Sequence, residues 1–283
     1  MSIKLVASDL DGTIIDRNNN IAPQNFEAIK KVLKKNIPFV VCTGKSYSVS
    51  KKICDQFQAS FGIFGNGTQI IDLRSGKEIL RKVISQKDLL FIITLAKRNN
   101  FHVHIYTDSE IISEKLEYMD LRNFILKSQN ANDSLSFNIV HNILTYVENN
   151  NINAFSIVVT TEKATLLNFK KILSINNEID SVFINKRGKY RDDIIGKDYE
   201  YLNISPININ KNEALTYLAN FLHISKNDIM AIGDNVNDLE MVKNAGIGVA
   251  VNEAYDDLKN VAKYVTSNNV SGGAFAEAID KFI

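Results

Sequence analysis

The first 68 residues alternate between short apolar runs and amphipathic segments, and this alternation constrains the fold more than any other feature of the sequence. Apolar runs with β-forming residues occupy positions 3–8, 37–41 and 61–64. The segments between them, 23–35 and 47–57, carry apolar residues at helical spacing. Strands that alternate with helices predict a parallel sheet with helices on both faces. We therefore expect an α/β fold with a doubly wound parallel sheet.

The pattern changes after the third strand and returns near residue 204. Residues 69–84 are typical of a hairpin, and the segments after them are short and alternating, as in an α+β domain. After residue 204 we again expect buried strands, at 228–232 and 247–251. These patterns predict a Rossmann-like core made of residues 1–84 and 204–283, and an inserted α+β cap domain at 85–203.

Composition excludes several classes of function for this 283-residue chain. The net charge of +1 provides no broad field for nucleic acid or for an anionic membrane. We identify no apolar run long enough to span a membrane and no signal peptide. The two cysteines, Cys42 and Cys54, favour a reducing compartment. We expect a cytoplasmic protein that binds neither nucleic acid nor membranes, and a monomer, because nothing in the sequence requires a dimer.

The segment Val6–Thr13 reads V-A-S-D-L-D-G-T and places two carboxylates just beyond the first strand. Ligands of open α/β sheets bind beyond the carboxyl ends of strands. Asp9 and Asp11 are two residues apart, so a continuing strand would direct both side chains to one face. Gly12 allows the backbone to turn sharply and a ligand to approach. An acidic turn without catalytic function is the alternative interpretation of this segment alone.

Other predicted strand ends carry matching polar residues. Thr43-Gly44 follows the second strand, Lys211 begins a helix, and Gly233–Asp238 follows the strand at 228–232. Carboxylates are typical Mg²⁺ ligands in sites that also bind a substrate phosphate. A lysine and the backbone N–H groups near Gly44 suit phosphate oxygens. The set predicts a metal and phosphate site, with a structural ion-pair network as the alternative.

In these motifs the chain resembles the haloacid dehalogenase (HAD) superfamily, in its Cof-type branch of sugar and small-metabolite phosphatases with a class IIB cap. The family pattern of D-x-D-G-T, T-G, a lysine and G-D-x-x-N-D occurs here in the same order. Asn66-Gly67 is also similar to the N-G that follows the third strand in that family. The resemblance covers the whole core. It implies a Mg²⁺-dependent phosphatase whose cap selects a small phosphorylated metabolite, with sugar phosphates as the expected class.

The resemblance also implies a role for each matching residue. Asp9 would be the nucleophile that forms an aspartyl-phosphate, and Asp11 would be the general acid and then the general base. Mg²⁺ would be held by Asp9, the Asp11 carbonyl and Asp234. The implied phosphate-binding residues are Leu10, Thr43, Gly44, Lys211 and Asn237. The implied supporting residues are Gly12, Thr13, Asn235 and Asp238. Asp238 would orient Lys211 or a metal-bound water, and a role in the turn is the alternative for Asn235.

Two departures from the family pattern affect substrate handling more than chemistry. Lys45 stands where the family often has arginine after T-G, and Asn212 follows the motif lysine in place of glycine. Lysine keeps the charge of arginine and loses its bidentate geometry. In the cap, a basic run around a predicted turn offers four candidate substrate contacts, Lys186, Arg187, Tyr190 and Arg191. The alternative interpretation of this run is a solvated turn.

Two other functions share parts of this pattern. A phosphomutase of the phosphomannomutase kind also has D-x-D-G-T and a similar cap. A non-catalytic sensor of sugar phosphates would need the phosphate site alone. Both acids, Asp9 and Asp11, are present, and a pure binding protein has no need of both, which favours the phosphatase over the sensor.

Overall fold

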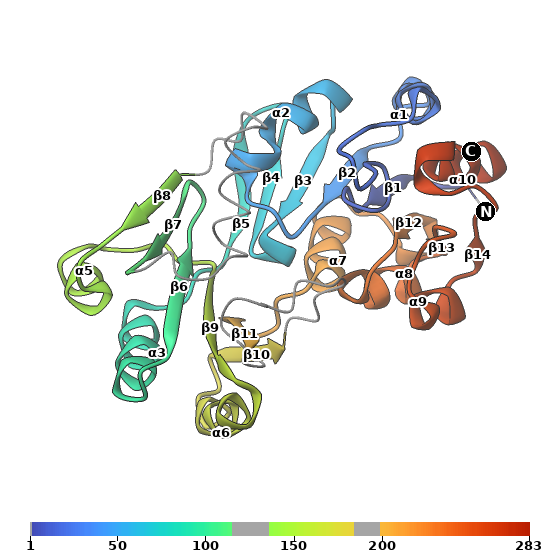
Figure 1. Ribbon diagram of the computed structural model, residues 1–283. Helices are drawn as coiled ribbons and strands as arrows, with labels where there is room; N and C mark the ends of the chain where they lie inside the picture. Colours follow the sequence, from blue (N-terminus) through green and yellow to red (C-terminus); the bar gives the residue numbers. More distant parts are fainter. Residues whose placement is uncertain (1, 115–135, 184–198) are drawn as a thin grey trace. The chain divides into compact units, whose positions relative to one another are not determined.

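The computed structural model describes residues 2–114, 136–183 and 199–283. The chain divides into two compact units, shown with colours that follow the sequence in Figure 1. Unit 1 comprises Met1–Arg81 and Ile209–Ile283, and unit 2 comprises Lys82–Asn208. Unit 1 is therefore discontinuous in sequence, and unit 2 is inserted between its two parts.

Unit 1 contains an eight-stranded sheet in the order β14-β13-β12-β1-β2-β3-β4-β5. The six strands from β14 to β3 are parallel, and β4 and β5 extend the sheet as an antiparallel hairpin. This arrangement confirms the predicted parallel, doubly wound sheet. The strands are β1 Leu5–Ser8, β2 Phe39–Cys42, β3 Phe61–Phe64, β4 Gln69–Asp72, β5 Lys77–Arg81, β12 Ile229–Gly233, β13 Ile247–Ala250 and β14 Tyr264–Val265.

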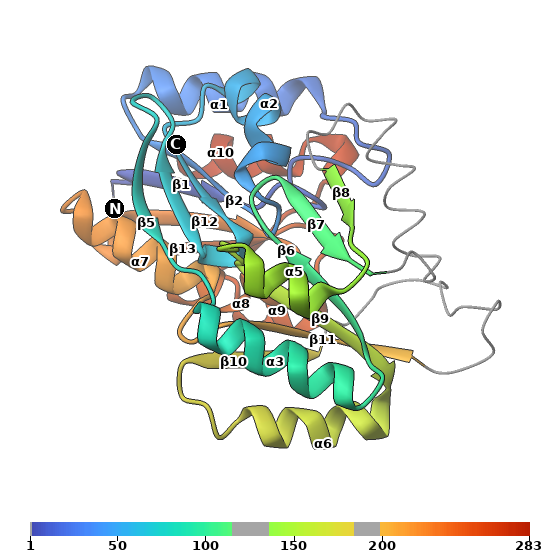
Figure 2. The ribbon, with the colours of Figure 1, turned by 90° about the vertical axis from the view of Figure 1, so that its left-hand side faces the viewer.

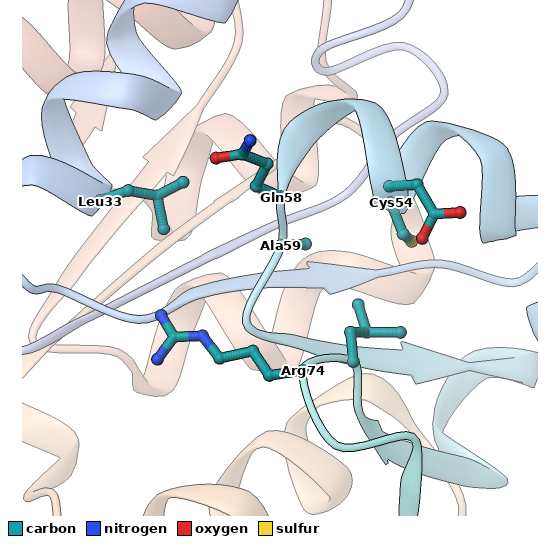
Figure 3. Close-up of a pocket in the computed structure, with 7 residues that line it drawn as sticks. Leu33, Cys54, Gln58, Ala59 and Arg74 are labelled. Atoms are coloured by element: carbon teal, nitrogen blue, oxygen red, sulfur yellow. The ribbon is translucent and has the colours of Figure 1, made fainter.

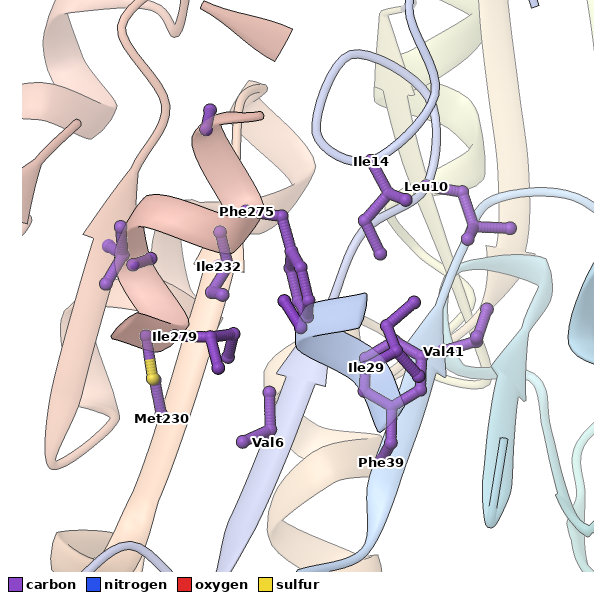
Figure 4. Packing of buried hydrophobic residues seen from close by; sticks show 14 of the residues in the cluster. Val6, Leu10, Ile14, Ile29, Phe39, Val41, Met230, Ile232, Phe275 and Ile279 are labelled. Atoms are coloured by element: carbon purple, nitrogen blue, oxygen red, sulfur yellow. The ribbon is translucent and has the colours of Figure 1, made fainter. Parts of the chain in front are cut away.

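Helices cover both faces of this sheet because successive strand side chains alternate between two cores. In β1, Val6 packs in one hydrophobic cluster, and Leu5 packs in the other. Figure 4 shows the first cluster, in which Val6 lies near Ile29 of α1 and Phe275 of α10. Each such fully buried side chain contributes about 1.5–3 kcal/mol of transfer free energy. The helices are α1 Pro23–Lys34, α2 Tyr47–Phe57, α7 Lys211–Phe221, α8 Leu239–Asn244, α9 Asp256–Val261 and α10 Ala274–Phe282, with short 3₁₀ turns η1 Gly65–Gly67, η2 Lys226–Asp228, η3 Val236–Asp238 and η4 Val270–Gly272.

Unit 2 has its own six-stranded sheet, in the order β10-β11-β9-β6-β7-β8, and its own core. The pairings are antiparallel except for β7 with β8. Helices α3, α5 and α6 pack on one face of this sheet (Figure 2). The elements are β6 His102–Tyr106, β7 Glu110–Ser113, β8 Ser136–Ile139, β9 Ser156–Glu162, β10 Ile179–Phe183, β11 Tyr199–Pro206, α3 Gln86–Arg98, α5 Ile143–Asn149 and α6 Lys163–Leu173.

The parallel strands of unit 1 end at one edge of the sheet. Ser8 of β1 is in register with Val41 of β2 and Ile232 of β12, so the residues that follow these strands emerge side by side. The predicted site residues of unit 1 follow such strand ends or begin α7. Within the described residues, no helix has the length and apolar character needed to cross a membrane.

Candidate active site

Asp9 is placed by the end of β1 and is almost completely buried. Its backbone N–H donates to the Ile232 carbonyl at 3.0 Å, which extends the β1–β12 pairing by one residue. Its residue exposure is 6%. One carboxylate oxygen, Oδ1, accepts from Lys211 Nζ at 2.6 Å. The other oxygen, Oδ2, accepts no hydrogen bond from the described residues, so it is the oxygen with capacity for a substrate or a cation.

Lys211 is the centre of the site's charge arrangement. It is the first residue of α7, and its side chain is completely buried. Nζ donates to Asp9 Oδ1 at 2.6 Å and to Asp238 Oδ1 at 2.7 Å. An ammonium in the first turn of a helix opposes the helix dipole. Burial also disfavours the charge, but the carboxylates of Asp238 and Asp9 outweigh burial and raise the pKa of Lys211 above its usual value.

Asp9 is under opposing influences. Burial raises the pKa of its carboxyl group well above the usual range, Lys211 lowers it, and the charges of Asp238 and Asp234 raise it further. The net shift of the Asp9 pKa is upward because removing the carboxylate from water costs more free energy than its attraction to the Lys211 ammonium restores. A positive charge added near Asp9 would therefore favour its ionised form.

Asp238 is held by the 3₁₀ turn after β12. Its Oδ1 accepts from Lys211, and its Oδ2 accepts from the backbone N–H groups of Asp234 at 3.1 Å and Asn235 at 3.0 Å. Asn235 and Asp238 together form a capping box for η3. Both oxygens of Asp238 are thus occupied, which fits a residue that holds Lys211. Asn235 acts locally as a cap, which corresponds to the turn role left open by the sequence.

The carboxylates of Asp9, Asp234 and Asp238 each place one oxygen within 4.8 Å of the others, and all three residues are buried. Oxygen-only donors at one point are the ligand type that Mg²⁺ prefers. Because Asp238 is engaged by Lys211 and two amides, Asp9 and Asp234 are the donors best suited to a cation. The residues therefore fit a hard divalent cation.

Gly12 provides the space for Asp234. Its φ of +86° lies in the left-handed region, and a Cβ atom added there would lie 2.5 Å from Asp234 Oδ2. A residue with a side chain would displace that carboxylate. Thr13 is buried, and its hydroxyl lies 3.4 Å from Asp234 Oδ1. The D-G-T part of the motif thus shapes the wall against which Asp234 rests.

Apart from Lys211, which begins α7, the predicted phosphate-binding residues lie in the segments after β1, β2 and β12. Thr43 is buried and accepts from the Lys45 backbone N–H at 3.2 Å, whereas Gly44 is exposed. Asn237 is exposed on η3. The side chain of Leu10 is packed in the core, as Figure 4 shows, so only its backbone could contact a phosphate.

The structure adds two contacts that the sequence did not predict. Lys45 Nζ donates to Asp11 Oδ1 at 2.8 Å, and both side chains are partly exposed. Asn237 Nδ2 donates to Asn66 Oδ1 at 2.9 Å. Both new partners stand in segments that the sequence had marked, Lys45 in place of the family arginine and Asn66 in the N-G after β3. The sequence does not predict these pairings, because the two residues are far apart in the chain: 34 residues separate Lys45 from Asp11, and 171 separate Asn237 from Asn66.

The predicted substrate contacts of unit 2 lie outside the described residues. These are Lys186, Arg187, Tyr190 and Arg191.

A cavity of about 360 Å³ lies elsewhere in unit 1 and contains none of the predicted site residues (Figure 3). It is lined by the carboxyl-terminal parts of α1 and α2 and by the β4–β5 turn, including Leu33, Gln58 and Arg74. These segments precede β2 and β3 or connect the edge hairpin, so they lie at the edge opposite the strand ends that carry Asp9 and Thr43.

Comparison with known proteins relates this arrangement to a family. The sequence profile of the haloacid dehalogenase-like hydrolases matches residues 6–279. A Bacillus subtilis 5-amino-6-(5-phospho-D-ribitylamino)uracil phosphatase is 29% identical over 290 residues, which cover 99% of this chain and 98% of that protein. The phosphoglycolate phosphatase of Methanobrevibacter smithii is 24% identical over 284 residues, with full coverage of both chains at 100%.

Solved structures give the same result for the fold. A haloacid dehalogenase-like hydrolase from Bacteroides thetaiotaomicron superposes with a TM-score of 0.80 at 22% identity and covers 100% of both chains. The profile match extends from β1 to α10 and includes every motif described above. The chain belongs to the haloacid dehalogenase-like hydrolase family and is one of its Cof-type phosphatases.

Proposed function

We propose that the protein is a Mg²⁺-dependent phosphatase that hydrolyses small phosphorylated metabolites, with sugar phosphates as the main class, through an aspartyl-phosphate on Asp9. The observation that carries this proposal is the buried cluster in which Lys211 Nζ joins Asp9 and Asp238 beside Asp234. A buried lysine that contacts the nucleophile can also stabilise the phosphoryl group during transfer.

In the first step, Asp9 Oδ2 attacks phosphorus and the bond from phosphorus to the ester oxygen breaks. Asp11 donates a proton to that oxygen, and the alcohol leaves. In the second step, Asp11 takes a proton from water, the water oxygen bonds to phosphorus, and the bond to Asp9 breaks to release phosphate. Asp11 suits proton exchange with a leaving group because it is exposed, whereas Asp9 is buried.

Positive charge near the transferred group has three sources in this proposal, two lysines and a metal ion. Lys211 is fixed by its two carboxylate contacts. Lys45 lies at the exposed side of the site, where its Nζ donates to Asp11. Mg²⁺, held by Asp9, Asp234 and the Asp11 carbonyl, would offset the repulsion between the carboxylates and the phosphate dianion. Asp238 supports the reaction by holding Lys211.

The substrate class rests on chemistry and on the relatives. One relative at 29% identity is named for a substrate with a phosphorylated ribityl chain, which is a sugar-alcohol phosphate. Another is named for phosphoglycolate, a two-carbon phosphate. We propose that the inserted unit 2 acts as the cap that selects among such substrates and excludes bulk water from the reaction.

The test is phosphate release from p-nitrophenyl phosphate and from a panel of sugar, sugar-alcohol and short-chain phosphates. We expect turnover with Mg²⁺ and none with EDTA. Asp9→Asn should lower kcat by about four orders of magnitude or more, and Asp55→Asn, an exposed carboxylate on α2, is the matched control. Inactivity with Mg²⁺ across the whole panel would contradict the proposal.

The intermediate has its own test. Acid quenching of a reaction with ³²P-labelled substrate should trap label on the protein, and Asp9→Asn should abolish it. Asp11→Asn should slow turnover about 10²–10⁴-fold, the usual contribution of a general acid–base. Label that persists in Asp9→Asn would remove Asp9 from the nucleophile role.

A further inference from the structure

The short turn η1, Gly65–Gly67, contacts three of the segments assigned to phosphate binding. Its Asn66 side chain accepts from Asn237 Nδ2 at 2.9 Å. Among the described residues, this is the only side-chain hydrogen bond of Asn237. Asn237 is exposed on a three-residue turn, so little else restricts its side-chain rotation.

The same turn is joined to the loop after β2. The Asn66 backbone N–H donates to the Thr43 carbonyl at 3.1 Å, and the Gly65 N–H donates to the Lys45 carbonyl at 2.9 Å. The Asn66 amide group also lies against Gly44, where an added Cβ would be 3.1 Å from Asn66 Oδ1. Asn66 is therefore packed between Gly44 and Asn237.

A third contact joins the turn to the start of α7. Gly67 has a φ of +113°, and an added Cβ would lie 2.5 Å from the carbonyl oxygen of Asn210. Asn210 is the N-cap of α7, and Lys211 follows it. The turn thus touches the segments that carry Thr43, Lys211 and Asn237, which come from three separate parts of the chain.

We propose that η1 sets the spacing of the phosphate-binding groups, and that Asn66 is the positioning residue that orients the Asn237 amide. This inference rests on the proposed function. An amide nitrogen carries two hydrogens, so the bond to Asn66 uses one N–H of Asn237 and directs the other. A donor held in place before the substrate arrives needs no reordering when phosphate binds.

Asn66→Gly is the appropriate variant, because Asn66 has a φ of +57° and glycine accepts that conformation without strain. Asn36→Gly is the matched control: Asn36 has the same φ of +57°, is exposed, and lies between α1 and β2, at the end of β2 opposite to Thr43. Thermal stability of both variants close to that of the wild type would show that the fold is retained in both.

Two measurements test the proposal on wild type, Asn66→Gly, Asn237→Ala, the double variant and Asn36→Gly. The first is kcat/KM on p-nitrophenyl phosphate with Mg²⁺, and the second is the Kd of inorganic phosphate by calorimetry, which needs no turnover. We expect Asn66→Gly to lower kcat/KM about tenfold and to weaken phosphate binding, with Asn36→Gly unchanged. Because Asn66 acts through Asn237, the double variant should be no worse than Asn237→Ala alone.

The outcomes separate this inference from the proposed function. Wild-type protein that binds phosphate and hydrolyses no ester contradicts the proposed function, and the phosphate Kd values then decide the role of Asn66. Wild-type kinetics and phosphate affinity in Asn66→Gly, or fully additive losses in the double variant, would overturn the positioning role. Wild-type protein that neither binds inorganic phosphate nor hydrolyses a phosphate ester overturns both the proposed function and the positioning role of Asn66.

Discussion

Removing the ammonium of Lys211 should destabilise unit 1 far more than removing an exposed ammonium does. Lys211→Met keeps much of the side-chain volume and leaves two carboxylates without their shared cation. The side chains of Lys211 and Asp238 are 0% exposed and that of Asp9 is 9% exposed, so water cannot replace the lost contacts. Breaking a buried ion pair from one side costs about 3–5 kcal/mol, and we expect the free energy of unfolding to fall by that amount.

Two further variants make this prediction specific. Lys51→Met breaks the Lys51–Asp55 pair, whose side chains are 56% and 60% exposed, and should cost at most about 1 kcal/mol. Lys211→Met combined with Asp238→Asn removes one of the stranded charges. The amide oxygen introduced at position 238 can still accept from the backbone N–H groups of Asp234 and Asn235, so the double variant should be more stable than Lys211→Met alone.

The assay must report on unit 1, because the two units can unfold separately. Native-state hydrogen exchange of the β1 and β12 amides in increasing urea gives that free energy. EDTA should be present, so that no cation substitutes for the missing ammonium. A loss within 1 kcal/mol of the Lys51→Met loss, or a double variant less stable than Lys211→Met, would refute the reasoning from buried charge.

Three other predictions concern separate parts of the molecule. Gly12→Ala should raise the Mg²⁺ concentration for half-maximal activity about tenfold or more by displacing Asp234, whereas Gly76→Ala, with a φ of +72° and no atom within 4 Å of an added Cβ, should not change it; equal values for the two variants would contradict this. Burial raises the pKa of Cys54 to about 12, so at pH 8 about one thiol in ten thousand is ionised, and Ellman's reagent should react with it only after denaturation; rapid reaction with the native protein would be the contrary result. Burial raises the pKa of Glu114, but hydrogen bonds from an α3 lysine and a backbone amide outweigh it and leave the pKa below the model-compound value of 4.5. The stability it contributes is therefore present above pH 4.5 and is lost as pH falls through the lower folded value. Wild type should exceed Glu114→Gln by about 1 kcal/mol at pH 7, and the difference should shrink as the pH falls below 4.5; a gap that widens in acid would contradict the sign.

The sequence predicts the arrangement of the fold because the patterns that indicate strands and helices are local. Apolar runs of four or five residues, each followed by a polar turn and an amphipathic helix, predict a doubly wound sheet without reference to distant residues. The sequence pattern does not predict the shortest helices in the same way. Helices α5 and α9 have seven and six residues, which is too few for a helical period to stand out from a loop, and tertiary packing stabilises them.

By itself, the sequence determined the residue types and the order of the motifs, because these are properties of adjacent positions. Its motifs alone indicate Asp9, Lys211 and Asp234 as candidate site residues. Only the tertiary structure decided which groups touch. The contact from Lys211 to Asp9 spans 202 residues, and that from Asn237 to Asn66 spans 171. Such contacts depend on strand register, loop conformation and side-chain burial together, and no local pattern encodes that combination.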